Sequence, residues 1–153
     1  MNISRPFAAV LALLLTVPAS AADPILIGVI GSLTGAEATY GLSTRHGVEL
    51  AIEELNAKGG LKGRKFAAKV YDDQGKPEEA ATATTRLVSQ DKVAIVLGEV
   101  ASSRSLAMAP IAEANKVPMI TPSSTNPRVT KDGGKVRQWV FRVCFIDPFQ
   151  GTV

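Results

Sequence analysis

The chain has 153 residues, of which 46% are hydrophobic, and its formal net charge is only +3. A charge this small, scattered over many positions, argues against a nucleic-acid-binding protein. Cys144 is the only cysteine and His46 the only histidine, so the chain cannot form an internal disulfide and lacks the usual ligands of a zinc or iron–sulfur centre. We therefore expect neither a cofactor nor a metal.

The N-terminus has the pattern of a secretory signal peptide. Arg5 supplies a positive charge, Phe7–Val17 is an uncharged run of eleven residues, and Ala19-Ser20-Ala21 gives a small-residue cleavage site. A membrane anchor is the alternative, but eleven helical residues rise only about 16 Å, against about 30 Å of hydrocarbon core. We therefore predict a signal peptide over residues 1–22, removed on export, and a periplasmic or otherwise extracytoplasmic mature chain.

After this leader, short apolar segments alternate with helical ones. Residues 25–30 are an apolar run without polar alternation, which is typical of a strand buried on both faces. A loop to about residue 43 precedes a helix in which Val48, Ala51, Ile52 and Leu55 form one apolar stripe. The other expected elements are a strand over 66–71, a helix from Pro77 with Ala80, Ala81, Thr84, Leu87 and Val88 on its inner face, a strand over 93–97, a helix over 103–115, and strands over 118–121 and 139–145.

This alternation predicts an α/β protein with a doubly wound parallel sheet, covered by helices on both faces. In such sheets, ligands bind beyond the carboxyl ends of the strands. Here that edge would carry residues 32–42, 72–76, 98–103 and 121–126.

Two of these edge segments are rich in small hydroxyl side chains. Ser102 follows a strand at the start of a helix, where free N–H groups and the positive helix end favour an anion. Residues 121–127, with Ser123 and Thr125, follow the next strand and contain two prolines that stiffen the backbone. Together the segments predict a site that holds a carboxylate with uncharged donors. The alternatives are that Ser102 is an ordinary N-cap and that residues 123–126 are a polar turn.

No arrangement of residues predicts catalysis. The pair Asp72-Asp73 is more typical of a strand-ending turn than of a metal or acid–base site, because neighbours on a strand point to opposite sides. The sequence contains neither a dinucleotide-binding glycine pattern, nor a P-loop, nor a nucleophile elbow, and His46 lacks the partners of a triad. We expect that the chain is not an enzyme; a small exported hydrolase is the less favoured alternative.

A series of segments along the chain carries a resemblance to one family. They are IGVIGSLTG (27–35), IEELNAKGGLKG (52–63), YDD (71–73) and MITPSSTNP (119–127). With them, the sequence closely resembles the N-terminal part of the leucine/isoleucine/valine-binding protein family, the periplasmic solute receptors of branched-chain amino acid ABC transporters. Other members of this family take amides, urea, aromatic acids and other small solutes, so the resemblance does not identify the ligand.

The resemblance implies a type I periplasmic binding protein fold, in which two α/β lobes close on the ligand. Residues 23–144 would be the first lobe and residues 145–153 the crossing into a second lobe, so that the fold is incomplete and Pro148 begins an unfinished helix. The implied ligand is an amino acid of the leucine, isoleucine or valine type, and the implied partner is an ABC permease in the inner membrane. A truncated product that binds nothing, or a receptor for another small solute, is the alternative.

The resemblance also assigns roles to four residues. Ser102 would donate to the ligand carboxylate through its hydroxyl and its backbone N–H, and Ser123 would offer its carbonyl to the ligand ammonium. Thr125 would contact both groups, and Tyr40 would border the pocket for the ligand side chain.

The sequence departs from some members of the family in one respect. Those members have a disulfide between the loop after the second strand and the loop before the ligand serine. Gly75 and Ala101 stand at these two places here, so that bridge is absent.

Overall fold

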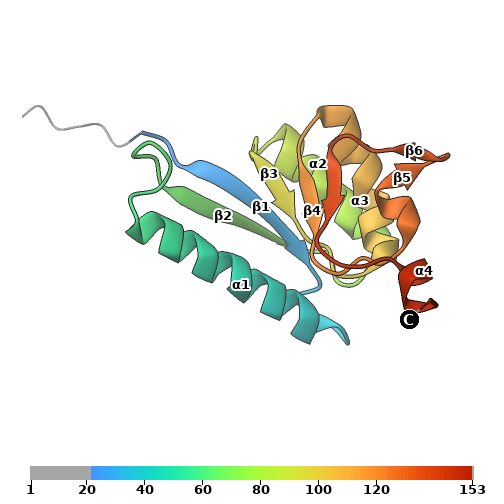
Figure 1. Ribbon diagram of the computed structural model, residues 1–153. Helices are drawn as coiled ribbons and strands as arrows, with labels where there is room; N and C mark the ends of the chain where they lie inside the picture. The colour runs from blue at the N-terminus through green and yellow to red at the C-terminus, as the bar shows by residue number, and fades with distance from the viewer. Residues whose placement is uncertain (1–21, 153) are drawn as a thin grey trace, which may run out of the picture.

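The computed structural model describes residues 22–152, and all but the last residue of the expected signal peptide lies outside the described residues. The centre of the molecule is a parallel sheet with strand order β2-β1-β3-β4-β7 (Figure 1). In that order the strands are Phe66–Asp72, Ile25–Gly31, Ile95–Leu97, Met119–Thr121 and Val140–Arg142. The predicted α/β class and parallel sheet are confirmed.

Helices lie on both sides of the sheet (Figure 1). α1 (Ala38–Ala57) packs on β1 and β2, whereas α2 (Pro77–Ser89) and α3 (Ser102–Asn115) pack against each other on the opposite face. A 3₁₀ helix, η1 (Pro127–Val129), and an antiparallel hairpin of β5 (Lys131–Asp132) and β6 (Lys135–Val136) separate β4 from β7. None of the helices in residues 22–152 is long and apolar enough to cross a membrane.

Two prolines begin helices, as the sequence predicts. Pro77 opens α2, and Pro148 lies in the first turn of α4 (Asp147–Gln150). Proline suits these positions because its missing N–H would have no acceptor within the helix.

The main hydrophobic core lies between the sheet and the pair α2 and α3. α2 contributes the predicted inner face, except that Ala83 is buried and Ala81 is only half-buried. A Cβ on Gly28 of β1 would lie 2.8 Å from Leu87 Cδ1, so α2 packs directly against this strand. Six large side chains of this cluster are 0% exposed: Ile30, Leu87, Val96, Met108, Met119 and Val129. Burial of each contributes about 1.5–3 kcal/mol.

Three predicted boundaries were wrong by two residues or more, and several others by one residue. α1 begins at Ala38 rather than after residue 43, because the hydroxyls of Ser43 and Thr44 donate to carbonyls four residues earlier and fit within the helix. β3 begins at Ile95 rather than residue 93. β7 ends at Arg142, and the apolar Val143 beyond it is 76% exposed, since no helix among residues 22–152 covers that face of the strand.

Candidate functional site

The candidate site lies at the carboxyl edge of the sheet. Because β1 to β4 run parallel, the loops that follow them meet at this edge. The loops after β3 and β4 are in direct contact: the N–H of Asn126 donates to Ser102 Oγ at 3.2 Å, and Ser123 Oγ donates to the carbonyl of Val100 at 3.0 Å. The structure thus brings together the two hydroxyl-rich segments of the sequence.

Ser102 is the first residue of α3. The interpretation of Ser102 as an N-cap was wrong, because the N-cap residue is Ala101 and no side chain caps this helix. The Ser102 hydroxyl instead accepts a hydrogen bond from the β4 loop. The N–H groups of the first helical turn have no acceptor within the helix, and together with the helix dipole they favour an anion at this end.

The other three predicted ligand residues lie on two elements. Ser123, which is exposed, and Thr125, which is half-buried, belong to the β4 loop, and the carbonyl of Thr125 accepts from the N–H of Asp147 in α4 at 3.1 Å. Tyr40, in the first turn of α1, is 64% exposed. The polar-turn interpretation holds for Asn126, whose side chain accepts from the N–H of Arg128 at 2.9 Å and caps η1. The ligand-binding roles of these residues stay predictions.

A buried ion pair beside these loops was missed by the sequence analysis. Glu99 and Arg104 are 1% and 5% exposed, and Glu99 Oε2 lies 2.7 Å from Arg104 Nε. The same carboxylate accepts from the N–H of Ala101 at 2.7 Å and from the N–H of Ser32 at 3.3 Å. The sequence held one signal for this pair: two charged residues five positions apart within a run of small and apolar residues.

Arg104 extends the pair to two further loops. Its guanidinium donates to the carbonyl of Gly75 at 3.3 Å, after β2, and to the carboxylate of Glu37, before α1. Burial acts to lower the pKa of Arg104, but the hydrogen bonds to Glu99 and Glu37 outweigh burial and hold the pKa above its ordinary value. The guanidinium is therefore a fixed positive charge among acidic groups.

Asp73 is the second buried acidic residue of this region and is 0% exposed. Its Oδ1 accepts from Ser32 Oγ and from the N–H of Gly75, both at 2.9 Å. Its Oδ2 lies 3.7 Å from Arg104 Nε and receives no hydrogen bond from the described residues. Burial raises the pKa of Asp73 above its ordinary value, although the hydrogen bonds from Gly75 and Ser32 act to lower it.

Asp72 has a different environment from its neighbour. Its carboxylate accepts from the N–H groups of Leu33 and Gln74 at 2.9 and 2.8 Å and from Thr34 Oγ1 at 2.6 Å. Burial acts to raise the pKa of Asp72, but these hydrogen bonds together outweigh it and lower the pKa. Asp72 therefore closes a turn, as the strand-ending interpretation predicts. Within residues 22–152, no cluster of three or more His, Cys, Asp or Glu side chains is arranged to hold a metal.

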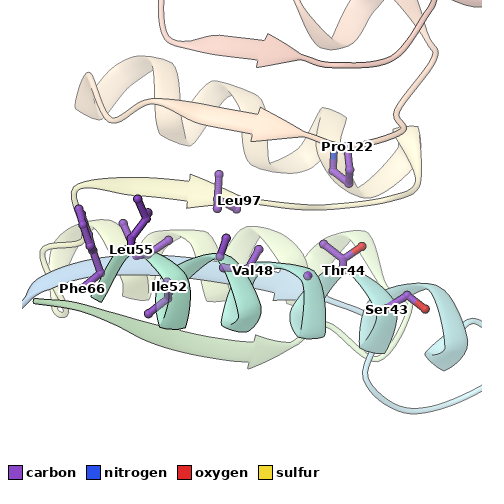
Figure 2. Close-up of a pocket in the computed structure, with 11 residues that line it drawn as sticks. Ser43, Thr44, Val48, Ile52, Leu55, Phe66, Leu97 and Pro122 are labelled. Carbon is purple, nitrogen blue, oxygen red and sulfur yellow. The ribbon is translucent and has the colours of Figure 1, made fainter. Parts of the chain in front are cut away.

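An apolar groove of about 370 Å³ lies on the sheet face between α1 and β3, and Pro122 of the β4 loop borders it (Figure 2). Val48, Ile52 and Leu55 of α1 face it, opposite Leu97 of β3 and Phe66 of β2. The predicted apolar stripe of α1 thus points toward the sheet but is incompletely covered, and Leu55 is 47% exposed. None of the four predicted ligand residues lines this groove. It is a feature of the sheet face that meets the candidate site only at Pro122.

Comparisons with known proteins agree on one group. The sequence matches the family described as periplasmic binding protein over residues 24–151. It is 38% identical over 152 residues to the leucine-, isoleucine-, valine-, threonine-, and alanine-binding protein of Pseudomonas aeruginosa, a match that covers 99% of this chain and 40% of that protein.

Solved structures show the same likeness. A leucine-binding protein of Thermotoga maritima superposes with a TM-score of 0.75 at 46% identity, over 83% of this chain and 34% of that one. A branched-chain amino acid transporter substrate-binding protein of Streptococcus pneumoniae, solved with isoleucine, gives a TM-score of 0.76 at 35% identity, over 81% and 34%. The chain thus spans 34–40% of the length of these relatives.

Proposed function

Because the chain belongs to the periplasmic binding protein family, we propose that it supplies the first lobe of an extracytoplasmic receptor that delivers a branched-chain or related amino acid to an ABC transporter. Its relatives support this ligand class, since they are named as binding proteins for leucine, isoleucine and valine, and one was solved with isoleucine. In this proposal residues 23–144 form the lobe, and residues 145–153 begin the crossing to a second lobe. The partner is an ABC permease.

One observation carries the proposal for this chain: the first turn of α3 and the β4 loop are held side by side at the carboxyl edge. The hydrogen bond from Asn126 N–H to Ser102 Oγ and that from Ser123 Oγ to the Val100 carbonyl join them. This arrangement gathers hydroxyl groups and free N–H groups at the positive end of a 14-residue helix. It suits the carboxylate of an amino acid.

The proposed contacts follow from the charges of a free amino acid. The ligand carboxylate accepts from the hydroxyl and N–H of Ser102 and from the hydroxyl of Thr125, and the ligand ammonium donates to the carbonyl of Ser123. Tyr40 borders the ligand side chain. Uncharged donors hold the anion without an opposite charge, which favours release to a transporter.

The edge of one lobe is open, whereas small-molecule sites usually bury about 70–90% of the ligand surface. In hinged receptors a second lobe closes over the ligand and supplies that burial. The family consists of binding proteins, so no reaction is proposed.

The test is calorimetry on the exported protein with leucine, isoleucine and valine. We expect Ser102→Ala combined with Thr125→Val to weaken binding by about 2 kcal/mol or more, because two hydrogen bonds to a charged ligand are lost. That loss corresponds to a Kd about 30-fold higher.

Ser103→Ala is the matched control, since Ser103 is the exposed neighbour of Ser102 in the same helical turn. Its affinity should equal that of the unchanged protein. Unchanged affinity in the double variant would reject the assigned contacts. Binding of an amide, urea or an aromatic acid in place of all three amino acids would keep the receptor role and overturn the ligand class.

A further inference from the structure

Glu99 is a buried residue beside the candidate site that none of the proposed ligand contacts uses. Three hydroxyl oxygens lie within hydrogen-bond distance of its backbone carbonyl: Thr121 Oγ1 at 2.6 Å, Ser105 Oγ at 3.1 Å and Ser124 Oγ at 3.1 Å. The Oγ atoms of Ser105 and Ser124 are also 2.7 Å apart, and because each hydroxyl has one proton, one of them donates to the other and the second donates to the carbonyl. Both the carbonyl and the carboxylate of Glu99 are therefore fully engaged inside the protein.

The partners of this one residue come from different loops of the carboxyl edge. The carboxylate bonds to Ser32 after β1 and to Ala101 after β3, and the carbonyl bonds to Ser124 after β4. Arg104 adds the loop after β2 through the carbonyl of Gly75. A single ion pair thus joins the four loops from which the site is built.

We propose that Glu99 and Arg104 are positioning residues of the amino-acid site, which set the spacing between Ser102 and the β4 loop. This inference rests on the proposed function. Ala101, whose N–H bonds to the Glu99 carboxylate, immediately precedes Ser102. Ser124, whose hydroxyl bonds to the Glu99 carbonyl, lies between Ser123 and Thr125. Each ligand-binding segment is therefore fixed to Glu99 at the residue next to its proposed contacts.

The charges of the pair matter as much as its geometry. A buried carboxylate is costly unless it is paired and hydrogen-bonded, and Arg104 provides that pairing. The guanidinium also offsets the negative charge of Glu99 near the place where a ligand carboxylate would bind. Removing either charge leaves the other buried without its main partner, so the loops must rearrange.

The test compares Glu99→Gln with the unchanged exported protein by calorimetry. Gln keeps the size of the side chain and removes its charge. We expect the Kd values for leucine, isoleucine and valine to rise about tenfold or more, since small displacements of binding groups are costly. The factor should be the same for all three ligands, because the loops hold the groups that these amino acids share.

Glu113→Gln is the matched control. Its carboxylate also accepts from two backbone N–H groups, those of Gln138 and Trp139, both at 2.9 Å, but it lies near the opposite end of α3. It should lower the urea midpoint of unfolding and leave the Kd within about twofold of the unchanged protein. If Glu99 had only a structural role, Glu99→Gln would likewise lower the urea midpoint of unfolding and leave the Kd within about twofold.

If Glu99→Gln does not fold, Ser124→Ala tests the positioning role instead, because it removes one hydroxyl and leaves the ion pair intact. We expect its Kd for each ligand to rise about threefold or more. Unchanged Kd values in folded Glu99→Gln, or in Ser124→Ala where the former is unfolded, would overturn the inference even if Ser102→Ala with Thr125→Val weakens binding. If the unchanged protein binds none of the three amino acids, the proposed function fails and this inference with it.

Discussion

The two faces of the sheet differ in how completely they are covered. Val96 of β3 and Met119 of β4 point toward α2 and α3 and are 0% exposed. Their neighbours Leu97 and Ile120 point to the other face, where they are half-buried and border a hollow with Val143, which is 76% exposed. The same short strands therefore supply one closed and one open apolar surface.

This difference shows that the apolar composition of a strand predicts which side chains favour burial, whereas the positions of the helices determine which of them are buried. Apolar residues on both faces of a strand are typical of a parallel sheet that is covered twice. That prediction is right for β1 and β2, which lie between α1 and α2. For β3, β4 and β7 the prediction is right for only one face, because no helix among residues 22–152 covers the other face (Figure 1).

The largest expected effect is on the closed face. Leu87→Ala should lower the free energy of unfolding by about 2–5 kcal/mol, because it leaves a cavity among fully buried side chains. Leu55→Ala on the open face is the matched control, and its 47% exposure predicts a loss of about 1 kcal/mol or less. Urea unfolding measures both, and equal losses would contradict the comparison.

A smaller effect concerns the end of β2, where Asp72 and Asp73 lie in unlike surroundings. The pKa of Asp72 is below its ordinary value of 3.8, so its contribution to stability is present above that pH and is lost as the pH falls through the folded pKa. The pKa of Asp73 is raised, so stability is instead lost as the pH rises through the folded pKa.

Urea midpoints between pH 3 and pH 7 measure these opposite signs. The gain in stability over this range should be smaller in Asp72→Asn than in the unchanged protein, and larger in Asp73→Asn. Shifts of the same sign in both variants would show that the two carboxyl groups share one environment.

The smallest effect on stability is expected at the open face itself. Val143→Lys should change the free energy of unfolding of a polypeptide of residues 23–153 by about 0.5 kcal/mol or less, because the side chain is already exposed. It should also reduce self-association of that polypeptide, since exposed apolar patches promote contact between molecules. Sedimentation measures the association, and a loss of stability like that of Leu87→Ala would show that the face is covered.

The parallel sheet, its helices and the contact between two hydroxyl-rich loops could be predicted from the sequence because they depend on local patterns. The apolar run before Ser102 marks a strand, and Pro77 marks a helix start. The ion pair of Glu99 and Arg104 could not be predicted in the same way. Two of its partners, Ser32 and Glu37, are each 67 positions away along the chain, and no periodicity links residues at that distance.

The burial of this ion pair has a consequence for the conditions in which the protein works. Dissolved salt weakens interactions between exposed charges, such as Arg45 with Glu49, whose side chains are 40% and 39% exposed, but it weakens buried pairs far less. The Glu99 and Arg104 side chains are 1% and 6% exposed. They join Ala101 to Gly75 through an ion pair and hydrogen bonds rather than through a disulfide. The loops of the carboxyl edge should therefore keep their spacing in dilute or salty surroundings, whether oxidising or reducing.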